Sequence, residues 1–224
     1  MSSPRKVSDS TVRRLSSYLR ILRELSSGGT ETVSSDRLAE LGGLTSAQVR
    51  KDLSQFGNFG VRGRGYDVSA LAEELTRILG LDREWRTVVV GAGRLGSALT
   101  AYPDFSVQGF RILALFDSDP SKHGRRFGEA TVLPLEELEE FVRERKVEVA
   151  ILTTPAAAAQ AAADRLVAAG IHGILNFAPT TLDVPDTVHV RVVNLAIELE
   201  GLSYAIREDG SRGTGSSGGG PDEE

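Results

Sequence analysis

The chain has 224 residues, no cysteine, a net charge of −5, 40% apolar residues and 25% charged residues. This composition is typical of a folded globular protein, and the missing cysteine excludes disulfides, thiolate metal sites and thiol nucleophiles. The three histidines show no metal-ligand spacing, so no metal is expected. No apolar run reaches about 18 residues, and the N-terminus has no apolar signal region, so we expect a cytoplasmic protein with no membrane partner.

The charge is divided unevenly along the chain. The first 66 residues carry 11 basic and 6 acidic side chains, and the remaining 158 residues carry 15 basic and 25 acidic ones. The net charges of the two parts are therefore +5 and −10. Such asymmetry favours a basic part that binds nucleic acid joined to a part with another task. Ordinary scatter of surface charge is the alternative.

The N-terminal part is predicted to form three helices. Apolar residues at helical spacing predict a first helix over 12–25, which two glycines end. A second helix is expected over 33–41, with Leu38 and Leu41 facing inward. Thr45 begins the third helix, and the last two helices form a helix–turn–helix.

The third helix carries the candidate base-reading residues. Thr45 and Gln48 fit a capping box, in which the Thr45 hydroxyl accepts the Gln48 amide N–H and the Gln48 side chain reaches back. The buried face is expected at Val49, Leu53 and Phe56. The opposite face presents polar and basic side chains of the types that address base edges. These DNA-binding candidates are Ser46, Gln48, Arg50 and Lys51.

A glycine-rich hairpin is expected to follow this helix. Glycine recurs at alternate positions in residues 60–68, with Arg62 and Arg64 at the tip and Tyr66 returning to the core. Such a wing places arginines near phosphates or the minor groove. With a helix over 69–81, residues 1–83 are predicted to be a winged-helix domain that binds double-stranded DNA. A small helical bundle with solvated arginines is the alternative.

From Trp85 onward the pattern changes to alternating strands and helices, which is typical of an α/β fold with a parallel sheet. Strands are expected over 87–90, 110–116, 147–152, 171–177 and 188–193. Helices are expected over 95–102, 135–145, 156–169 and 195–206. The predicted domains are therefore a Rossmann-like domain at 84–193, a C-terminal helix at 194–207 and a disordered Gly/Ser-rich tail at 208–224.

The first of these strands ends in the glycine turn Gly91-Ala92-Gly93-Arg94-Leu95-Gly96. G-x-G-x-x-G between a strand and a helix is the fingerprint of dinucleotide binding, with the phosphates at the helix N-terminus. Asp117 ends the next strand, 21 residues after Gly96. A carboxylate there accepts hydrogen bonds from ribose hydroxyls and favours NAD(H) over NADP(H). Another nucleotide or coenzyme A is the alternative for such a turn.

The chain offers no evident catalytic set. None of the histidines ends a strand beside a carboxylate partner, and Tyr102 lacks a lysine three or four residues further on. A binding sensor is therefore favoured over an enzyme. A small NAD-dependent oxidoreductase with a basic head and a coenzyme A-binding regulator are the alternatives.

Several longer segments resemble the Rex family of bacterial NADH-sensing repressors. The matching segments are residues 17–22, 49–53 followed by 56–57, 62–66, 91–96, 116–120 and 173–179. The resemblance implies a homodimer that binds a palindromic operator and is released by NADH, with NAD+ competing for the same site. It also implies that the helix over 195–206 is exchanged between subunits and packs near the partner's cofactor site.

The resemblance also assigns roles to single residues. It assigns DNA contacts to Arg50, Lys51, Arg62 and Arg64. It assigns cofactor contacts to the glycine turn and Asp117. Tyr102 is a candidate for the switch near the nicotinamide, and simple packing is the alternative role for Tyr102 and Phe177. The further cofactor-binding residues are Thr153, Thr154, Pro155, Asn176, Phe177, Ala178 and Pro179.

One position departs from the family pattern. Some members have an aspartate at the start of the exchanged helix, able to pair with the tyrosine or with an arginine of the first helix, whereas this chain has Asn194. Asparagine accepts a hydrogen bond but forms no ion pair with Arg20. A switch that depends on such a pair is therefore in question here, or uses Glu198 instead.

Overall fold

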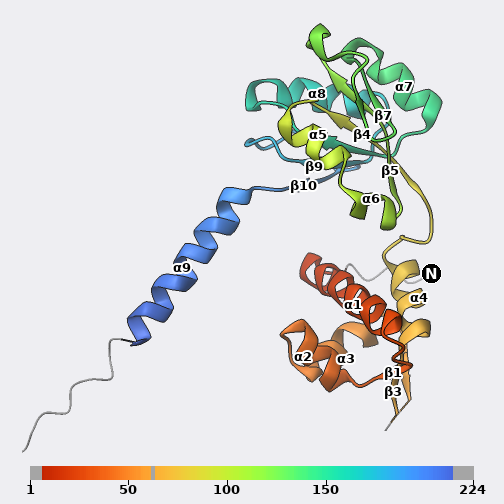
Figure 1. Cartoon of the computed structure of the whole chain (residues 1–224), viewed down its shortest axis with the longest axis vertical. Helices are drawn as coiled ribbons and strands as arrows, with labels where there is room; N and C mark the ends of the chain where they lie inside the picture. The colour runs from red at the N-terminus through yellow and green to blue at the C-terminus, as the bar shows by residue number, and fades with distance from the viewer. Residues whose placement is uncertain (1–6, 62–63, 214–224) are drawn as a thin grey trace, which may run out of the picture. The chain divides into compact units, whose positions relative to one another are not determined.

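The computed structural model describes residues 7–61 and 64–213 (Figure 1). The chain divides between Glu84 and Trp85 into two compact units. Within the described ranges, no helix is both long enough and apolar enough to cross a membrane.

The N-terminal unit is built of four helices and a small antiparallel sheet. The strands stand in the order β1-β3-β2, and Tyr66 pairs with both Val33 and Gly60. The helices are α1 (Asp9–Ser27), α2 (Ser35–Gly42), α3 (Ser46–Ser54) and α4 (Val68–Ile78), and the strands are β1 (Thr32–Val33), β2 (Gly60–Val61) and β3 (Gly65–Asp67). The predicted helix–turn–helix and wing are therefore both present.

Side-chain caps fix where these helices begin. The Thr45 hydroxyl accepts the Gln48 amide N–H at 3.2 Å, as the capping box predicts. The other half of the box is wrong, because the Gln48 side chain points along the helix to Asp52. Ser34 caps α2 in the same way, so that helix begins after Val33, which belongs to β1.

The core of the N-terminal unit lies between α1, α4 and the helix–turn–helix. Val49 and Leu53 are buried as predicted, while Phe56 lies beyond the end of α3 and is only partly buried. The prediction that Leu41 faces inward is wrong. Leu38 is fully buried, but Leu41 is 42% exposed, because only one narrow face of α2 packs against the core.

The C-terminal unit is a seven-stranded sheet in the order β10-β9-β8-β4-β5-β7-β6, parallel except for the edge strand β6. The strands are β4 (Trp85–Val90), β5 (Phe110–Asp117), β6 (Arg126–Phe127), β7 (Ala130–Pro134), β8 (Val149–Leu152), β9 (Gly173–Asn176) and β10 (His189–Val192). The helices beside them are α5 (Arg94–Thr100), α6 (Pro103–Val107), α7 (Leu138–Arg145) and α8 (Ala156–Ala168), with 3-10 turns at Pro120–Lys122 and Leu135–Glu137. The β6–β7 hairpin and α6 were not predicted, since short elements carry little periodicity.

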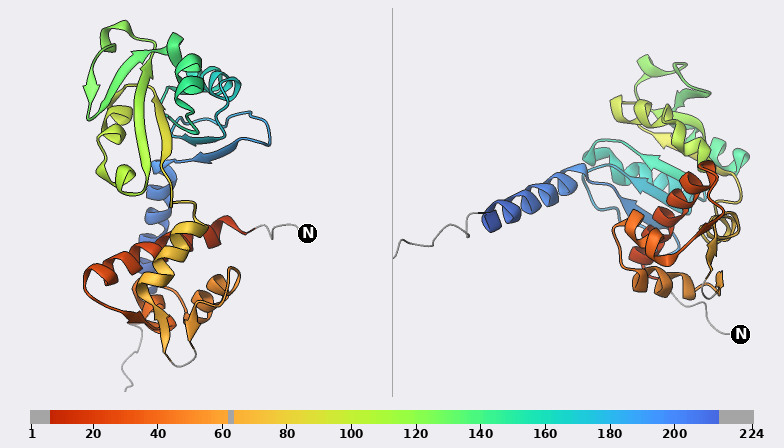
Figure 2. Two further views of the ribbon diagram at one scale, coloured as in Figure 1. Left: turned by 90° about the vertical axis from the view of Figure 1, so that its right-hand side faces the viewer. Right: turned by 60° about the horizontal axis from the view of Figure 1, so that its bottom comes forward.

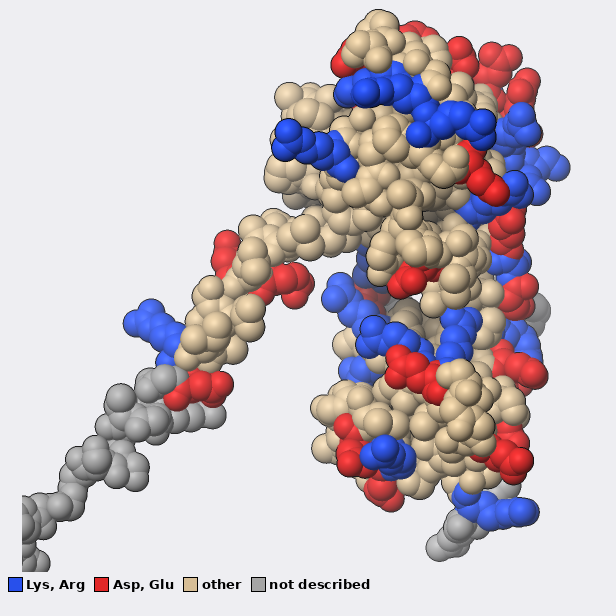
Figure 3. Space-filling view, in the orientation of Figure 1, with Lys and Arg blue, Asp and Glu red and all other residues tan. Residues whose placement is uncertain are grey.

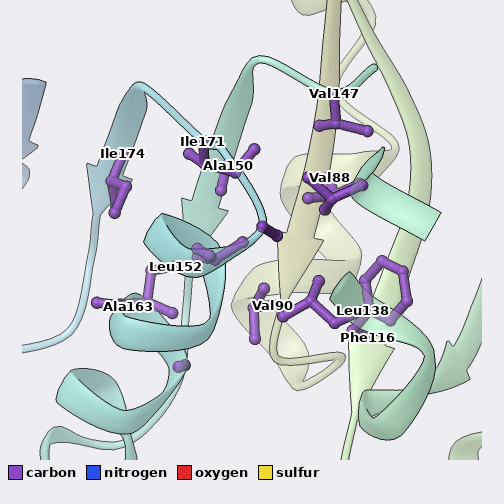
Figure 4. Close-up of a cluster of buried hydrophobic side chains, with 14 of the residues drawn as sticks. Val88, Val90, Phe116, Leu138, Val147, Ala150, Leu152, Ala163, Ile171 and Ile174 are labelled. Atoms are coloured by element: carbon purple, nitrogen blue, oxygen red, sulfur yellow. The ribbon is translucent and has the colours of Figure 1, made fainter. Parts of the chain in front are cut away.

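Helices cover both faces of this sheet, so its central strands β4 and β8 end in runs of buried apolar residues. Val88 and Val90 point to one face and Val89 to the other. Figure 4 shows the first face, where Leu138 of α7 and Ala163 of α8 lie in the cluster that holds Val88 and Val90. Because the strands run parallel, β4, β5, β8 and β9 bring their carboxyl ends to one edge.

The helix α9 (Leu195–Gly213) follows β10 and leaves its apolar side chains exposed. Figures 1 and 2 show it extending from the end of β10, and Figure 3 shows uncharged surface along much of it. It runs past the predicted end, so residues 208–213 are helical and not disordered. Residues 214–224 of the predicted tail lie outside the described residues.

Replacing Leu38 and Leu41 tests the packing of α2. We expect Leu38→Ala to lower the free energy of unfolding by about 2–5 kcal/mol, because it leaves a cavity in a fully buried site. The same change at the exposed Leu41 should cost no more than about 0.5 kcal/mol. Urea unfolding followed by circular dichroism measures both. Equal losses for the two variants would contradict the observed face of α2.

Candidate functional site

The glycine turn lies at the centre of the sheet edge, where the strand order reverses. The chain passes from β4 to β5 on one side and later returns to β8 on the other. Open α/β sheets bind their ligands at such a point, outside the carboxyl ends of the strands. The turn and the loop after β8 therefore face the same space.

Thr153 and the neighbouring strand hold the turn in place. Gly91 has φ +104°, and its N–H donates to the Phe116 carbonyl at 2.7 Å. The Thr153 hydroxyl donates to the Gly91 carbonyl at 2.8 Å. A Cβ at Gly91 would meet Thr153 at 2.9 Å, and one at Gly96 would overlap the Gly91 carbonyl. Both glycines are therefore needed by the fold itself.

Gly93 differs from its two neighbours in this respect. A Cβ added there would have no protein atom within 4 Å, and its backbone is extended. Gly93 is also the N-cap of α5 and brings no side chain to the free N–H groups of the first turn. The missing side chain keeps this place open for a group outside the chain, as a pyrophosphate requires.

Two cavities flank the turn. The larger one, the α8 cavity, has a volume of about 730 Å³ and lies beside the start of α8. The smaller one, the α9 cavity, has a volume of about 420 Å³ and lies beside the start of α9. The α8 cavity is lined by Val90, Gly91, Gly93, Phe116, Asp117, Ser118, Asp119, Lys122, Leu135, Thr153, Thr154, Pro155, Ala158, Ala161, Ala162 and Arg165. The α9 cavity is lined by Leu95, Phe177, Ala178, Pro179, Thr180, Thr181, Val192, Val193, Asn194, Leu195 and Ala196.

Asp117 lies at the wall of the α8 cavity, and protein donors already hold it. Its Oδ2 accepts the Ala92 N–H and the Lys122 ammonium, both at 2.8 Å, and its Oδ1 accepts the Asp119 N–H at 2.9 Å. Burial alone raises the pKa of Asp117, but Lys122 and the two backbone donors outweigh it and hold the pKa below its usual value. The carboxylate is therefore ionised, and Oδ1 keeps one acceptor site for a ribose hydroxyl.

A buried hydroxyl on the same wall has no partner. Thr154 Oγ1 is buried and makes no hydrogen bond with the described chain. Leaving a buried polar group unpaired costs about 1–3 kcal/mol. Thr154 is one of the residues that line the α8 cavity, together with the small side chains of Ala158, Ala161 and Ala162.

The loop after β9 builds one side of the α9 cavity. Asn176 is fully buried, and its side chain is used within the loop: Nδ2 donates to the Thr180 carbonyl at 2.8 Å, and Oδ1 accepts the Ala178 N–H at 2.9 Å. The Asn176 side chain therefore positions this loop, and the place of Asn176 beside the cofactor stays a prediction. Phe177, Ala178 and Pro179 line the cavity itself.

Five predicted cofactor residues line neither cavity: Ala92, Arg94, Gly96, Asn176 and Tyr102. Ala92 is buried and offers its N–H to Asp117, and Arg94 is exposed at the start of α5. Tyr102 is 50% exposed, and its hydroxyl donates to Asp104 at 3.0 Å. Lys122, Arg165 and the alanines of α8 line the α8 cavity without having been predicted. Lys122, five residues after Asp117, was the one with a visible signal, because a cation near a strand-end carboxylate suggests an ion pair.

The predicted DNA-binding residues lie on α3 and the wing. Arg50 and Lys51 are exposed, Ser46 and Gln48 are half-buried, and Arg62 lies outside the described residues. Arg50 donates to the Ser35 hydroxyl of α2 at 2.9 Å. Arg50 and Arg64 both line a groove of about 620 Å³ between the helix–turn–helix and the wing. A groove with a cation on each wall suits a phosphate backbone.

Two family models match the chain. One, described as "Putative DNA-binding protein N-terminus", matches residues 6–54. The other, described as "CoA binding domain", matches residues 82–180. The two matches fall on the N-terminal and C-terminal units respectively, with three residues of the second match before Trp85.

Curated relatives match almost the whole chain. The redox-sensing transcriptional repressor Rex of Carboxydothermus hydrogenoformans is 53% identical over 204 residues, which cover 91% of this chain and 98% of the relative. Rex of Streptomyces coelicolor is 47% identical over 200 residues, which cover 89% of this chain and 78% of the relative.

Solved structures show the same similarity. The crystal structure of RSP in complex with β-NAD+ and operator DNA matches with a TM-score of 0.87 and 39% identity, over 96% of this chain and 100% of that one. The structure of RSP with β-NADH matches with a TM-score of 0.84 and 40% identity, over 92% and 96%. A further structure describes RSP as a Rex-family repressor.

A winged-helix unit joined to a dinucleotide-binding Rossmann unit defines a ligand-responsive transcriptional regulator. Within that class, the sequence identity to the curated relatives identifies the family. The chain belongs to the Rex family of redox-sensing transcriptional repressors. This confirms the predicted family, the predicted α/β fold and the prediction of a repressor in preference to an oxidoreductase.

Substitutions at Gly93 and Gly96 distinguish a glycine that a bound ligand requires from a glycine that the fold requires. We expect Gly93→Ala to keep the thermal midpoint and to weaken NADH binding at least about tenfold, because the added methyl group enters only the open space above the turn. Gly96→Ala should lower the thermal midpoint, because its methyl group overlaps the Gly91 carbonyl. Scanning calorimetry and fluorescence titration measure the two effects. Unchanged NADH affinity in folded Gly93→Ala would refute the proposed place of the phosphates.

Proposed function

We propose that this chain is a homodimeric repressor that binds a palindromic operator and leaves it when NADH occupies the C-terminal unit, with NAD+ competing for the same site. The observation that carries this proposal is the turn at Gly93, which is open to a group outside the chain and lies beside the α8 and α9 cavities. Because operator DNA is its proposed target, the proposed place of action is the cytoplasm.

The two cavities have different chemistry, which suggests how the dinucleotide lies. The α8 cavity is lined by the Asp117–Lys122 pair, so it suits the adenosine and its ribose. The α9 cavity is lined by Leu95 and Phe177, so it suits the nicotinamide end. The pyrophosphate would bridge them at Gly93, against the free N–H groups of α5.

The N-terminal unit supplies the proposed DNA contacts. Arg50 and Lys51 lie on the exposed face of α3, with Ser46 at its start. Arg62 and Arg64 are proposed to contact phosphates or the minor groove from the wing. A dimer that reads a palindrome sets its two recognition helices about 34–36 Å apart, one turn of DNA.

The dimer is proposed from the state of α9. Its apolar stripe is exposed from Leu195 to Ile206, and a folded chain in water leaves such a stripe open only where a partner covers it. The stripe consists of Leu195, Leu199, Leu202 and Ile206, each more than half exposed. A second copy of the chain, reached by exchange of α9, is the proposed partner.

In the proposed switch, Asn194 acts as a helix cap and not as a member of an ion pair. Its Oδ1 accepts the Ala196 N–H at 3.0 Å, so it caps the start of α9. Leu195 and Ala196 line the α9 cavity, which joins the proposed nicotinamide site to the proposed dimer helix. We therefore propose that the switch works through the placement of α9, with no ion pair to Arg20.

The switch requires NADH to bind one dimer shape better than the other. A ligand shifts such an equilibrium only by its difference in affinity, and a hundredfold difference corresponds to about 2.7 kcal/mol. NADH must therefore favour the shape that does not fit the operator, and NAD+ must favour it less.

A titration of the protein–DNA complex tests this function. A duplex selected by the protein from a random pool is held at fixed salt, and NADH, NAD+ or NADPH is added. We expect NADH to release the protein, NAD+ to oppose the release, and NADPH to act only at higher concentration because Asp117 repels the added phosphate. Fluorescence anisotropy of the duplex measures binding.

Arg50→Ala serves as the control, because it should lose affinity for DNA and keep its affinity for NADH. Equal DNA binding under all three nucleotides would refute the proposed sensing. The matched "CoA binding domain" model makes coenzyme A a second candidate ligand. It is tested by asking whether coenzyme A displaces bound NADH, and we expect that it does not.

Charged substitutions on α9 test the dimer. We expect Leu199→Glu/Leu202→Glu to sediment as a monomer and to lose operator affinity, because two carboxylates cannot be buried without partners. Arg207→Glu adds the same side chain at an already charged, exposed position and should stay dimeric. Analytical ultracentrifugation measures both. A double variant that sediments with the wild type would refute the proposed role of the stripe.

A further inference from the structure

A buried carboxylate sits inside the recognition helix. Asp52 lies on α3 between the buried Val49 and Leu53, and it is only 1% exposed. A charge at such a place is tolerated only when partners satisfy it. Asp52 receives four hydrogen bonds, two on each oxygen, so its acceptor capacity is full. The donors are Arg14 Nε at 2.6 Å and Tyr18 Oη at 3.0 Å to Oδ2, and Arg14 Nη2 and Gln48 Nε2 at 2.8 Å each to Oδ1.

Arg14 and Tyr18 come from α1, so this cluster ties α1 to α3. The guanidinium of Arg14 binds both carboxylate oxygens, and such a two-point contact fixes rotation as well as distance. Elsewhere α3 packs chiefly against α2. Burial raises the pKa of Asp52, but Arg14, Gln48 and Tyr18 outweigh it and hold the pKa below its usual value. The cluster therefore stays charged and intact at neutral pH.

Gln48 belongs to this cluster as well as to the predicted DNA-binding face. Glutamine reads adenine with its carbonyl and its amide nitrogen placed together at the base edge. Here the amide nitrogen is directed along the helix axis to Asp52, and the side chain is half-buried. Lys51 contrasts with it, because its side chain is exposed and its ammonium has no partner among the described residues.

We propose that Asp52 is the positioning residue of the recognition helix, and that Gln48 acts through Asp52 and does not read a base. The proposal rests on the proposed operator binding and refines it. Sequence preference then belongs to the exposed side chains of α3, while the Asp52 cluster sets the angle at which α3 is presented. Loss of the cluster should weaken every base contact together.

The affinity profile over base pairs tests this. The selected duplex and all its single-base-pair variants are measured with the wild type, Gln48→Ala and Gln55→Ala. We expect Gln48→Ala to lose about tenfold in affinity for every variant alike, with the order of preference unchanged. Gln55→Ala is the matched control, because the Gln55 side chain is exposed and makes no contact with the Asp52 carboxylate. The Gln55 backbone N–H, which donates to the Asp52 carbonyl at the end of α3, is kept in this variant. Its affinities should equal those of the wild type.

Two outcomes would overturn the proposal in distinguishable ways. If Gln48→Ala loses preference at one base pair and keeps the others, Gln48 reads that base and only this proposal fails. If the wild type binds every duplex alike, operator binding itself fails and the proposal fails with it.

A second pair of variants separates positioning from stability. Asp52→Asn removes the ion pair and should lower both the thermal midpoint and operator affinity. Arg14→Met/Asp52→Leu replaces the buried pair with apolar side chains, which often restores stability. We expect it to regain the midpoint without regaining operator affinity, while NADH affinity stays unchanged in both. Full operator affinity in the double variant would overturn the proposal, because it would reduce the cluster to a structural support.

Discussion

The hydrogen bond from the Thr153 hydroxyl to the Gly91 carbonyl is the contact on which the C-terminal unit depends. It joins the ends of β4 and β8, the two strands between which the chain reverses its order. Asp117 acts from the other side by holding the Ala92 N–H. The turn is thus fixed by protein groups at Gly91, Ala92 and Gly96, and is left open only at Gly93. A rigid frame around one open position is how a fold binds a phosphate group without closing over it.

The N-terminal unit uses the same principle with different chemistry. Buried polar groups fix the geometry, and exposed groups are left for the partner. Asp52 accepts four hydrogen bonds inside the unit, and Arg50 and Lys51 remain at the surface of the same helix. In both units the buried carboxylate is charged because cations and N–H groups outweigh the cost of its burial. Neither carboxylate is catalytic, which agrees with a family of repressors.

Most of the fold could be predicted from local patterns. The helices of the N-terminal unit and the main strands of the sheet repeat apolar residues at regular spacing, and the glycine turn has a strict spacing of its own. Side-chain partners could not be predicted in this way. From the local sequence, the Gln48 side chain could complete the capping box at Thr45 or contact Asp52 one turn further on. The structure has the contact with Asp52. Arg14, 38 residues away in the sequence, binds the same carboxylate and helps to fix it there. The full burial of Asn176 likewise depends on the backbone of its own loop, which no periodicity encodes.

The C-terminal helix α9 links the proposed cofactor site to the proposed dimer interface. An apolar stripe in water is unfavourable, and the side chains of the α9 stripe are each more than half exposed. On the proposed function a second subunit removes this cost, so the dimer is part of the folded state. The same helix starts in the α9 cavity with Leu195 and Ala196, so a nicotinamide bound there touches the element that joins the subunits. A chain without cysteine has no thiol with which to sense an oxidant. On the proposed function, it reads redox state from which form of the nucleotide fills this cavity, and α9 is the element proposed to transmit that difference.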